Sequence, residues 1–218
     1  MKTAYKLTDS EMRTYNEFQW ELGKWYETTG EGEIFSPGWF YFYNDPLVGL
    51  FMNPVHANIE NPRLFRAEVK GKFLDDNGLK CGYSRAKLVE ELPVPQISSV
   101  QWVRFAILCA KEVYKGKKWN KWADNWLSGK NRAINAAWIT KCNFCTIYAP
   151  DAACVATAAE SAFYATRLAF SAAENTFYIA KSATSAAESV AIAVYTAEIT
   201  AESKKIDLIG IVQKAMEE

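Results

Sequence analysis

The residues best suited to chemistry surround the single histidine of the chain. His56 lies in a segment with side-chain amides, a carboxylate and guanidinium groups, namely Asn53, Asn58, Glu60, Asn61, Arg63 and Arg66. Histidine is the commonest general acid or base near neutral pH, so a catalytic role is conceivable. However, no serine or cysteine nucleophile stands at a recognisable elbow. Loop structure, ligand binding and catalysis are therefore all open for this segment, and we assign no catalytic residue.

Five consecutive aromatic residues, Trp39 to Tyr43, precede this segment. On a half-buried strand, Trp39, Tyr41 and Tyr43 would face one way and the two phenylalanines the other. Aromatic faces beside Arg and Asn side chains are typical of a purine-nucleotide site. A strand buried on both faces is an equal alternative. In the ligand-binding interpretation, Trp39, Tyr41 and Tyr43 stack on a base. The histidine, asparagine and arginine side chains of the following segment contact ribose and phosphate groups. The predicted ligand-binding residues are Trp39, Tyr41, Tyr43, Asn53, His56, Asn58, Arg63 and Arg66.

The motif with the clearest metal or redox potential is a lone C-x-x-C pair, Cys142 and Cys145. A zinc site needs four ligands, and the chain offers neither a second such pair nor a second histidine. A redox motif would start a helix after a strand, whereas this pair lies inside an expected helix. We therefore predict no metal and no cofactor. The odd number of cysteines, 5, fits reduced thiols better than a disulfide framework.

The charge balance limits which classes of binding partner are expected. The 218 residues contain 25 Lys and Arg and 25 Asp and Glu, for a formal net charge of +0. A neutral chain lacks the general attraction to phosphate that nucleic-acid binding uses, so nucleic acid is an unfavourable partner. No apolar run is long enough for a membrane span, and the amino terminus lacks an apolar signal core. We therefore expect no membrane partner and a cytoplasmic location.

The composition predicts an α+β fold in three parts. Residues 1–95 hold most of the Gly and Pro and are expected to form a small mixed ligand-binding domain. Its strand candidates are residues 3–8, 18–22, 24–29, 38–43, 64–73 and 86–92. Pro46 after Asn44-Asp45 predicts a short helix. The segment 53–63, with two Asn-Pro pairs, is expected to be a polar loop.

Residues 96–149 are expected to form a tryptophan-rich helical connector. Ser98 and Gln101 have the spacing of a capping box, which would open a helix that ends at Gly116. A second helix over 118–128 would place Trp119, Trp122 and Trp126 on one face and end at Gly129. A third helix is expected over residues 132–148.

Residues 150–218 are expected to form one long alanine-rich helix. Glu160, Glu174, Glu188 and Glu202 recur fourteen positions apart, which is two heptads. A seam of small residues contributes little hydrophobic free energy to an isolated helix, so the helix needs a partner. Either a second copy in a coiled coil or a folded hairpin would supply one, and the lack of turn residues favours a homo-oligomer through residues 150–218.

Blocks of the sequence resemble a family of phage and prophage proteins. The resemblance rests on GWFYFYNDPLVGLFMNPVHANIENPRLFRAEVKG (38–71), LPVPQISSVQWVRFAILCAKEVY (92–114), W-x-x-WADNWLSG (119–129) and the alanine-rich tail. It implies a phage origin and no established activity. Within the first block, the order of strand, Gly-aromatic strand, Asn-Asp-Pro and helix is similar to the central segment of ADP-ribosyltransferase-like folds. That likeness implies a fold suited to ADP-ribose-type ligands, although the catalytic pattern of those enzymes is not evident.

These observations give one leading expectation and two alternatives. The leading one is a phage-encoded anti-defence protein that sequesters a small nucleotide-type host immune signal, ADP-ribose-like or cyclic, without cleaving it. By analogy, small phage proteins often act in this way. The first alternative is a structural or protein-interaction module that inhibits a host protein through its helices. The second is an enzyme that transfers ADP-ribose or cleaves a nucleotide.

Overall fold

A computed structural model describes residues 1–33, 36–76, 78, 80–113, 117–130 and 207–217. Its internal contacts divide the chain into two compact units, Met1–Gln96 and Ile97–Glu218. The division falls one residue after the expected domain boundary at 95. We call the first unit the N-terminal domain and the second the helical unit, and we describe each by itself.

The N-terminal domain is built on antiparallel strands with one helix. The strands are β1 (Lys2–Thr8), β2 (Arg13–Thr14), β3 (Phe18–Gln19), β4 (Tyr26–Glu27), β5 (Phe40–Phe42), β6 (Arg63–Asp75) and β7 (Cys81–Leu92). A 3-10 turn, η1 (Tyr15–Glu17), joins β2 to β3, and the helix α1 (Pro46–His56) follows β5. Together with the helices of the second unit, this arrangement makes the chain α+β, as expected from its composition.

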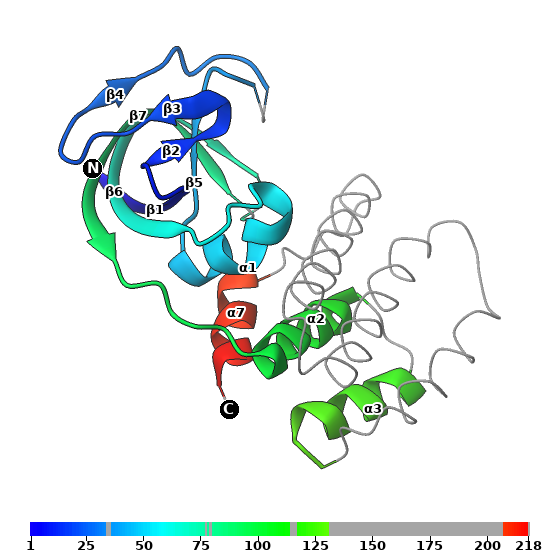
Figure 1. Ribbon diagram of the computed structural model, residues 1–218. Helices are drawn as coiled ribbons and strands as arrows, with labels where there is room; N and C mark the ends of the chain where they lie inside the picture. Colours follow the sequence, from blue (N-terminus) through cyan, green and yellow to red (C-terminus); the bar gives the residue numbers. More distant parts are fainter. Residues whose placement is uncertain (34–35, 77, 79, 114–116, 131–206, 218) are drawn as a thin grey trace. The chain divides into compact units, whose positions relative to one another are not determined.

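The main sheet curls until it meets its own first strand (Figure 1). The long strands β6 and β7 pair along their length, β1 pairs with β6, and β4 and β5 both pair with β7. Immediately after β5, Tyr43 exchanges two backbone hydrogen bonds of 2.8 Å with Tyr5 of β1. Register shifts in the β6–β7 pairing mark irregularities of the bulge type, which increase local twist and bending. β5 therefore links β7 to β1 and closes the sheet.

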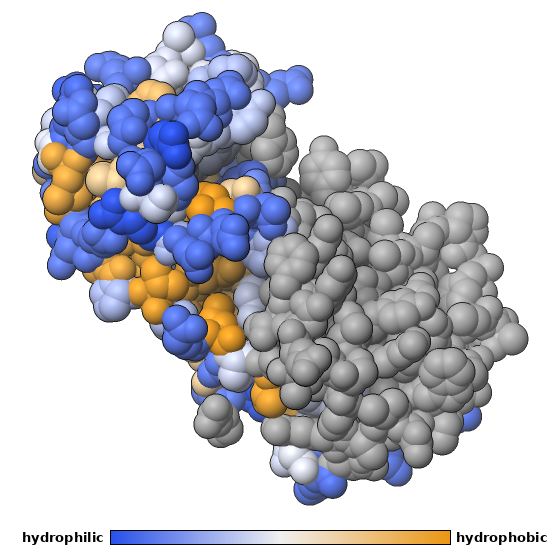
Figure 2. All heavy atoms as spheres, viewed as in Figure 1, coloured by the Kyte–Doolittle hydropathy of each residue, from blue (hydrophilic) through white to orange (hydrophobic). Residues whose placement is uncertain are grey.

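The closed sheet surrounds an interior rich in aromatic side chains. Trp20, Phe42 and Phe65 are among its fully buried members, and Phe18, Tyr26 and Phe40 pack against them. The Trp20 ring makes edge contacts with Tyr26, Phe40 and Phe42 at centroid distances of 5.2 to 6.0 Å. The visible outer face of the domain is mostly hydrophilic, with smaller apolar patches (Figure 2). As the alternation in the sequence predicted, Phe40 and Phe42 face this core.

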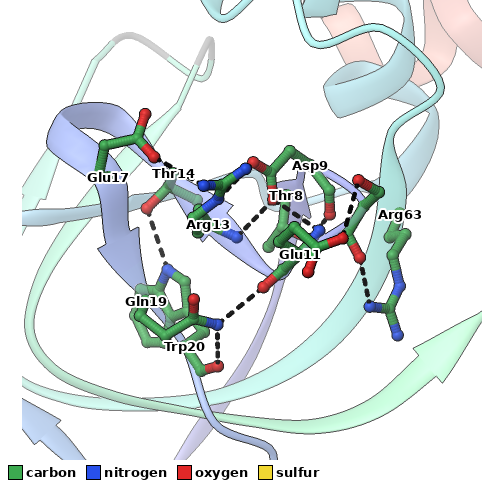
Figure 3. A network of polar contacts seen from close by, with 10 residues as sticks. Thr8, Asp9, Glu11, Arg13, Thr14, Glu17, Gln19, Trp20 and Arg63 are labelled. Atoms are coloured by element: carbon green, nitrogen blue, oxygen red, sulfur yellow. Dashed lines mark hydrogen bonds and ion pairs between the residues drawn. The ribbon is translucent and has the colours of Figure 1, made fainter.

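A polar network holds the hairpin of β2 and β3 that carries Trp20 into the core (Figure 3). Asp9 accepts hydrogen bonds from the backbone N of Arg13 at 2.7 Å and from its Nε at 2.9 Å. Arg13 also pairs with Glu17 at 3.0 Å, and the indole Nε1 of Trp20 donates to Thr14 Oγ1 at 3.1 Å. The backbone hydrogen bond from Arg13 is the largest cause that lowers the pKa of Asp9. The network therefore anchors the core tryptophan through a short surface hairpin.

Replacement of Thr14 by valine tests this anchor. Thr14→Val keeps the shape of the side chain but leaves the indole N–H of the 1 % exposed Trp20 without its acceptor. We expect a loss of about 1–3 kcal/mol in the free energy of unfolding, measured by urea denaturation. Thr14→Ser retains the hydroxyl and serves as the matched control. Equal stabilities of the valine and serine variants would contradict the proposed role of the bond.

The helix α1 begins as the sequence predicted. Asp45 caps it by accepting hydrogen bonds from the backbone N of Leu47 at 2.8 Å and of Val48 at 3.3 Å, and Pro46 occupies the first turn. The predicted loop over 53–63 is wrong at its start, because the helix continues through Pro54 to His56. Buried Phe51 and Met52 hold this last part against the domain core, which offsets the hydrogen bond that proline cannot donate.

In the helical unit, the structure describes α2 (Ser99–Val113), α3 (Lys117–Leu127) and α7 (Leu208–Met216). The predicted capping box is confirmed: Ser98 N donates to Gln101 Oε1 at 2.8 Å, and Gln101 N donates to Ser98 Oγ at 3.2 Å. The end of α3 is confirmed as well, since Gly129 has a φ of +75° and donates to the Trp126 carbonyl. Trp122 and Trp126 are buried as expected.

Arg104 joins the ends of two described helices to α2. Its guanidinium donates 3.0 Å hydrogen bonds to the carbonyl oxygens of Leu127 in α3 and of Lys214 in α7. Carbonyl groups at helix C-termini lack partners within the helix and carry partial negative charge, so a guanidinium is well suited to them. Gln101 adds a bond to the Met216 carbonyl at 3.1 Å. The carboxyl-terminal helix thus packs on α2.

Most of the segment expected to oligomerise, residues 150–218, lies outside the described residues, as do the expected helix over 132–148 and the C-x-x-C pair. At the described end, Asp207 has a ψ of 77° and its side chain caps α7. A helix therefore begins at Leu208 rather than continuing through this position. No helix in the described part of the chain is both long and apolar enough to cross a membrane.

Candidate functional site

Tyr43 and His56 form an aromatic pair between the end of β5 and the end of α1. The Tyr43 hydroxyl lies 3.2 Å from His56 Nδ1, and the rings are stacked with centroids 6.0 Å apart and planes inclined by 8°. Gly49 lets α1 approach this pair, because a Cβ there would lie 2.9 Å from the Tyr43 ring. Tyr43 is buried and His56 is half-buried. The end of α1 therefore holds the imidazole in a defined orientation.

Two lysines lie against β5 near this pair. Lys6 Nζ donates a hydrogen bond to the Tyr41 carbonyl oxygen at 2.6 Å and lies 5.2 Å from the Phe42 ring centroid. Lys80 Nζ lies 5.7 Å from the ring centroid of Tyr41. Both lysines and Tyr41 are half-buried. We call Lys6, Tyr41, Tyr43, His56 and Lys80 together the basic-aromatic surface; Lys6 reaches it from the core side, where its Nζ also lies over the Trp20 and Phe42 rings.

The basic groups of this surface disfavour one another's charged forms. Burial, followed by the charge of Lys80, lowers the pKa of Lys6 to about 8. The same two causes, in the same order, lower the pKa of His56 to about 4. Burial raises the pKa of Tyr43. At neutral pH the lysines therefore carry ammonium groups, His56 is a neutral imidazole and Tyr43 is a protonated phenol. The Tyr43 hydroxyl is then the donor and His56 Nδ1 the acceptor of their hydrogen bond.

Acidic and thiol groups near the lysines are few among the described residues. Burial raises the pKa of Asp76, and the charge of Lys80 acts in the opposite direction. The buried Cys81 thiol lies 3.5 Å from the Phe42 carbonyl oxygen and 3.4 Å from Asn44 Oδ1. Burial, with a smaller contribution from the Asp75 charge, raises the pKa of Cys81 to about 12, so it stays a thiol. The charges of Asp75 and Asp76 therefore act in the same region as Lys80 and Cys81.

The structure brings three of the eight predicted ligand-binding residues together: Tyr41, Tyr43 and His56. Trp39 has a separate role, since its Nε1 donates to the Gly32 carbonyl at 3.0 Å and its side chain covers Gly82. Asn53 and Asn58 shape the turn after α1. The amide of Asn53 bonds to both Ile59 N and Ile59 O, and Asn58 has a φ of +50°.

The two predicted arginines are engaged in ion pairs between β6 and β7. Arg63 forms a two-point contact with Glu91, with N–O distances of 2.8 and 2.6 Å, and Arg66 Nε bonds to Glu90 at 2.8 Å. The Glu91 side-chain bond is the largest cause that raises the pKa of Arg63. The structure therefore places these guanidinium groups with carboxylates and not with Tyr41 and His56.

Sequence reasoning missed Lys6 and Lys80. A signal for Lys6 exists in KTAYKLT, because period-two alternation puts Lys6 on the same face as the buried Ala4. A lysine on the core face of a strand is unusual enough to mark a position for attention. Lys80 carries no such signal, since its role depends on pairing between β5 and β7, whose residues are about forty positions apart.

Metal ligation has no candidate in the part of the chain that the structure describes, where no three His, Cys, Asp or Glu side chains lie close enough together to hold an ion.

Comparison with known proteins places the N-terminal domain in a group without an assigned function. Residues 2–100 match the family described as "Domain of unknown function (DUF7666)". The match spans almost the whole N-terminal domain and the first residues of the helical unit. The chain has no significant match among curated proteins or solved structures.

The pKa of His56 predicts a pH dependence of stability. Since its folded pKa of about 4 lies below the ordinary value of 6.5, the unfolded chain binds this proton more readily between these pH values. Stability should therefore fall as the pH decreases through this window, with His56 accounting for roughly 3 kcal/mol at most. In His56→Asn, which retains an acceptor for Tyr43, denaturation from pH 7 to 4 should show a shallower loss. An unchanged slope would contradict the assignment.

Proposed function

We propose that the N-terminal domain is a binding module for a small anionic ligand of nucleotide type, held at the basic-aromatic surface. The observation that carries this proposal is the position of Lys80, which lies over the Tyr41 ring and close enough to both Lys6 and His56 for its charge, after burial, to disfavour their charged forms. Positive groups whose charged forms are disfavoured in this way are typical of sites where a bound anion neutralises the charge.

The electrostatics favour an anion. Two ammonium groups that repel each other in a half-buried environment are both stabilised when a phosphate lies near them, because desolvated charges interact more strongly than charges in water. The half-buried ring of Tyr41 adds an aromatic surface of the kind that nucleobases contact. Phosphate and base recognition together select a nucleotide-type ligand over a simple carboxylate.

The state of His56 favours binding over turnover. An imidazole with a pKa near 4 is a poor proton donor at neutral pH, and its Nδ1 already faces the Tyr43 hydroxyl. A neutral imidazole in fixed orientation suits hydrogen bonding to a ribose or phosphate oxygen. Such a site fits capture of a nucleotide signal without cleavage, which is the role expected by analogy with small phage proteins.

Calorimetry against ADP-ribose, cyclic mononucleotides and cyclic dinucleotides tests the proposal. We expect at least one of them to bind the full chain, and Lys80→Gln to weaken that binding at least tenfold through the loss of one desolvated charge contact. Lys72→Gln is the matched control, because Lys72 bonds to the Thr29 carbonyl and pairs with Glu31. No binding of any of these ligands at micromolar protein, or equal effects of the two variants, would contradict the proposal.

A second measurement checks the charge coupling without any ligand. Since the charge of Lys80 lowers the pKa of His56, Lys80→Gln should raise that pKa toward its ordinary value, while Lys72→Gln should leave it unchanged. Imidazole resonances followed by NMR titration report this pKa directly, because His56 is the only histidine. A pKa that is identical in wild type and Lys80→Gln would show that the two groups are not coupled.

The two alternatives have distinct tests. A protein-interaction module would recover one stoichiometric protein in a pull-down and release no small molecule. An ADP-ribosyl-transferring or nucleotide-cleaving enzyme would consume nicotinamide dinucleotide or a cyclic nucleotide, and His56→Ala would abolish that consumption. Mass spectrometry of small molecules released from the purified protein separates both from the binding module.

A further inference from the structure

Trp25 lies on the outer face of the main sheet, away from the basic-aromatic surface. It directly precedes β4, where Tyr26 pairs with Ala86 and Glu27 with Arg85 of β7. The Tyr26 ring packs against the interior core, so alternation sends Trp25 and Glu27 outward. The indole therefore sits over the outward side chains of β7 and its neighbour β6.

Three cations surround this one indole. Lys70 Nζ lies 4.2 Å from a Trp25 ring centroid, Lys87 Nζ 5.1 Å and the Arg85 guanidinium carbon 5.4 Å. Lys70 and Arg85 are direct cross-strand partners, and Lys87 is two residues further along β7 on the same face. Cross-strand neighbours of like charge are unfavourable, so this clustering needs a compensating interaction.

Carboxylates offset the three charges only in part. Lys87 pairs with Glu68 at 2.8 Å, whereas Arg85 Nε lies 3.9 Å from Glu27, too far for a hydrogen bond. This Nε atom is buried and has no hydrogen-bond partner among the described residues. Within the same described part of the chain, Lys70 has no ion pair within 4.0 Å. Among the described residues, the indole face at 4.2 Å and the charge of Glu68 compensate the Lys70 ammonium.

We infer that Trp25, Lys70, Arg85 and Lys87 form an anion site that accepts the phosphate group of a compact phosphomonoester. A phosphate placed beside the indole would meet three cationic donors on two adjacent strands, including a guanidinium, whose geometry matches phosphate oxygens. The neighbouring carboxylates of Glu27 and Glu68 restrict the ligand, because they would repel an extended polyanion such as a nucleic-acid strand. The site is independent of the proposed function at the basic-aromatic surface.

The competing explanation is purely structural, with the cations serving only to fasten Trp25 and β4 onto β7. In that case added anions would act on the cluster through ionic strength alone. A phosphate site would instead respond to phosphomonoesters in a saturable manner at constant ionic strength, and the response would depend on Lys70.

NMR of the indole N–H groups in the full chain separates these explanations. Trp25→Phe assigns the Trp25 resonance, which is then followed during titration with phenyl phosphate and, separately, with sodium chloride at matched ionic strength. We expect a saturable shift with phenyl phosphate only, weakened at least fivefold in Lys70→Gln. Lys72→Gln and Lys80→Gln should leave it unchanged, the second because it alters only the basic-aromatic surface. Equal shifts with chloride, or equal affinity of Lys70→Gln and wild type, would overturn the inference.

The same titration with adenosine monophosphate and with phosphoserine identifies the source of the phosphate group. Tighter binding of the nucleotide assigns the site to nucleotide ligands, and tighter binding of phosphoserine assigns it to phosphorylated amino acids. Absence of a saturable response to phenyl phosphate, adenosine monophosphate and phosphoserine alike would overturn the inference.

Discussion

The structure of the N-terminal domain depends on the closure of one sheet by β5. This short strand pairs with β7, and the residue that follows it exchanges two hydrogen bonds with Tyr5 of β1. Closure packs Phe40 and Phe42 against Trp20, while Tyr41 stays half-buried and Tyr43 is buried with its ring stacked on His56. It also brings the Tyr41 carbonyl within 2.6 Å of Lys6 Nζ. The basic-aromatic surface is therefore a consequence of the same pairing that completes the core.

Both cationic clusters of the N-terminal domain hold lysines against aromatic rings. Lys6 extends from the core face of β1 toward the aromatic interior, and Lys70 lies over an indole on the outer face of β6. For Lys6, burial penalises the ammonium form, and the charge of Lys80 adds to the penalty. For Lys70, the unfavourable neighbour is the like charge of its cross-strand partner Arg85. These unfavourable charges support the binding roles that we propose for the two clusters.

Local features of the fold could be predicted from the sequence, whereas the sites depended on distant pairings. The capping box of Ser98 and Gln101, the Asp45 cap and the Gly129 end of α3 each involve residues a few positions apart. Alternation correctly placed Phe40 and Phe42 in the core. By contrast, Arg63 and Arg66 pair with glutamates 28 and 24 residues away, and the cations around Trp25 come from two strands, β6 and β7, far from Trp25 in the sequence. Contacts between residues so far apart cannot be predicted from their spacing in the sequence. The loop expected at Pro54 was wrong because tertiary packing outweighed the local preference of proline.

We propose that an anion bound at the basic-aromatic surface relieves the cost of the Lys6 charge, which burial and the charge of Lys80 disfavour. The most direct measurement is the pKa of Lys6, followed by NMR of its Cε carbon in the full chain, without and with ADP-ribose. The account predicts a pKa near 8 in the free protein and a rise toward 10.5 when the ligand is added. A value of 10.5 in the free protein, or a depressed value that the ligand leaves unchanged, would contradict it.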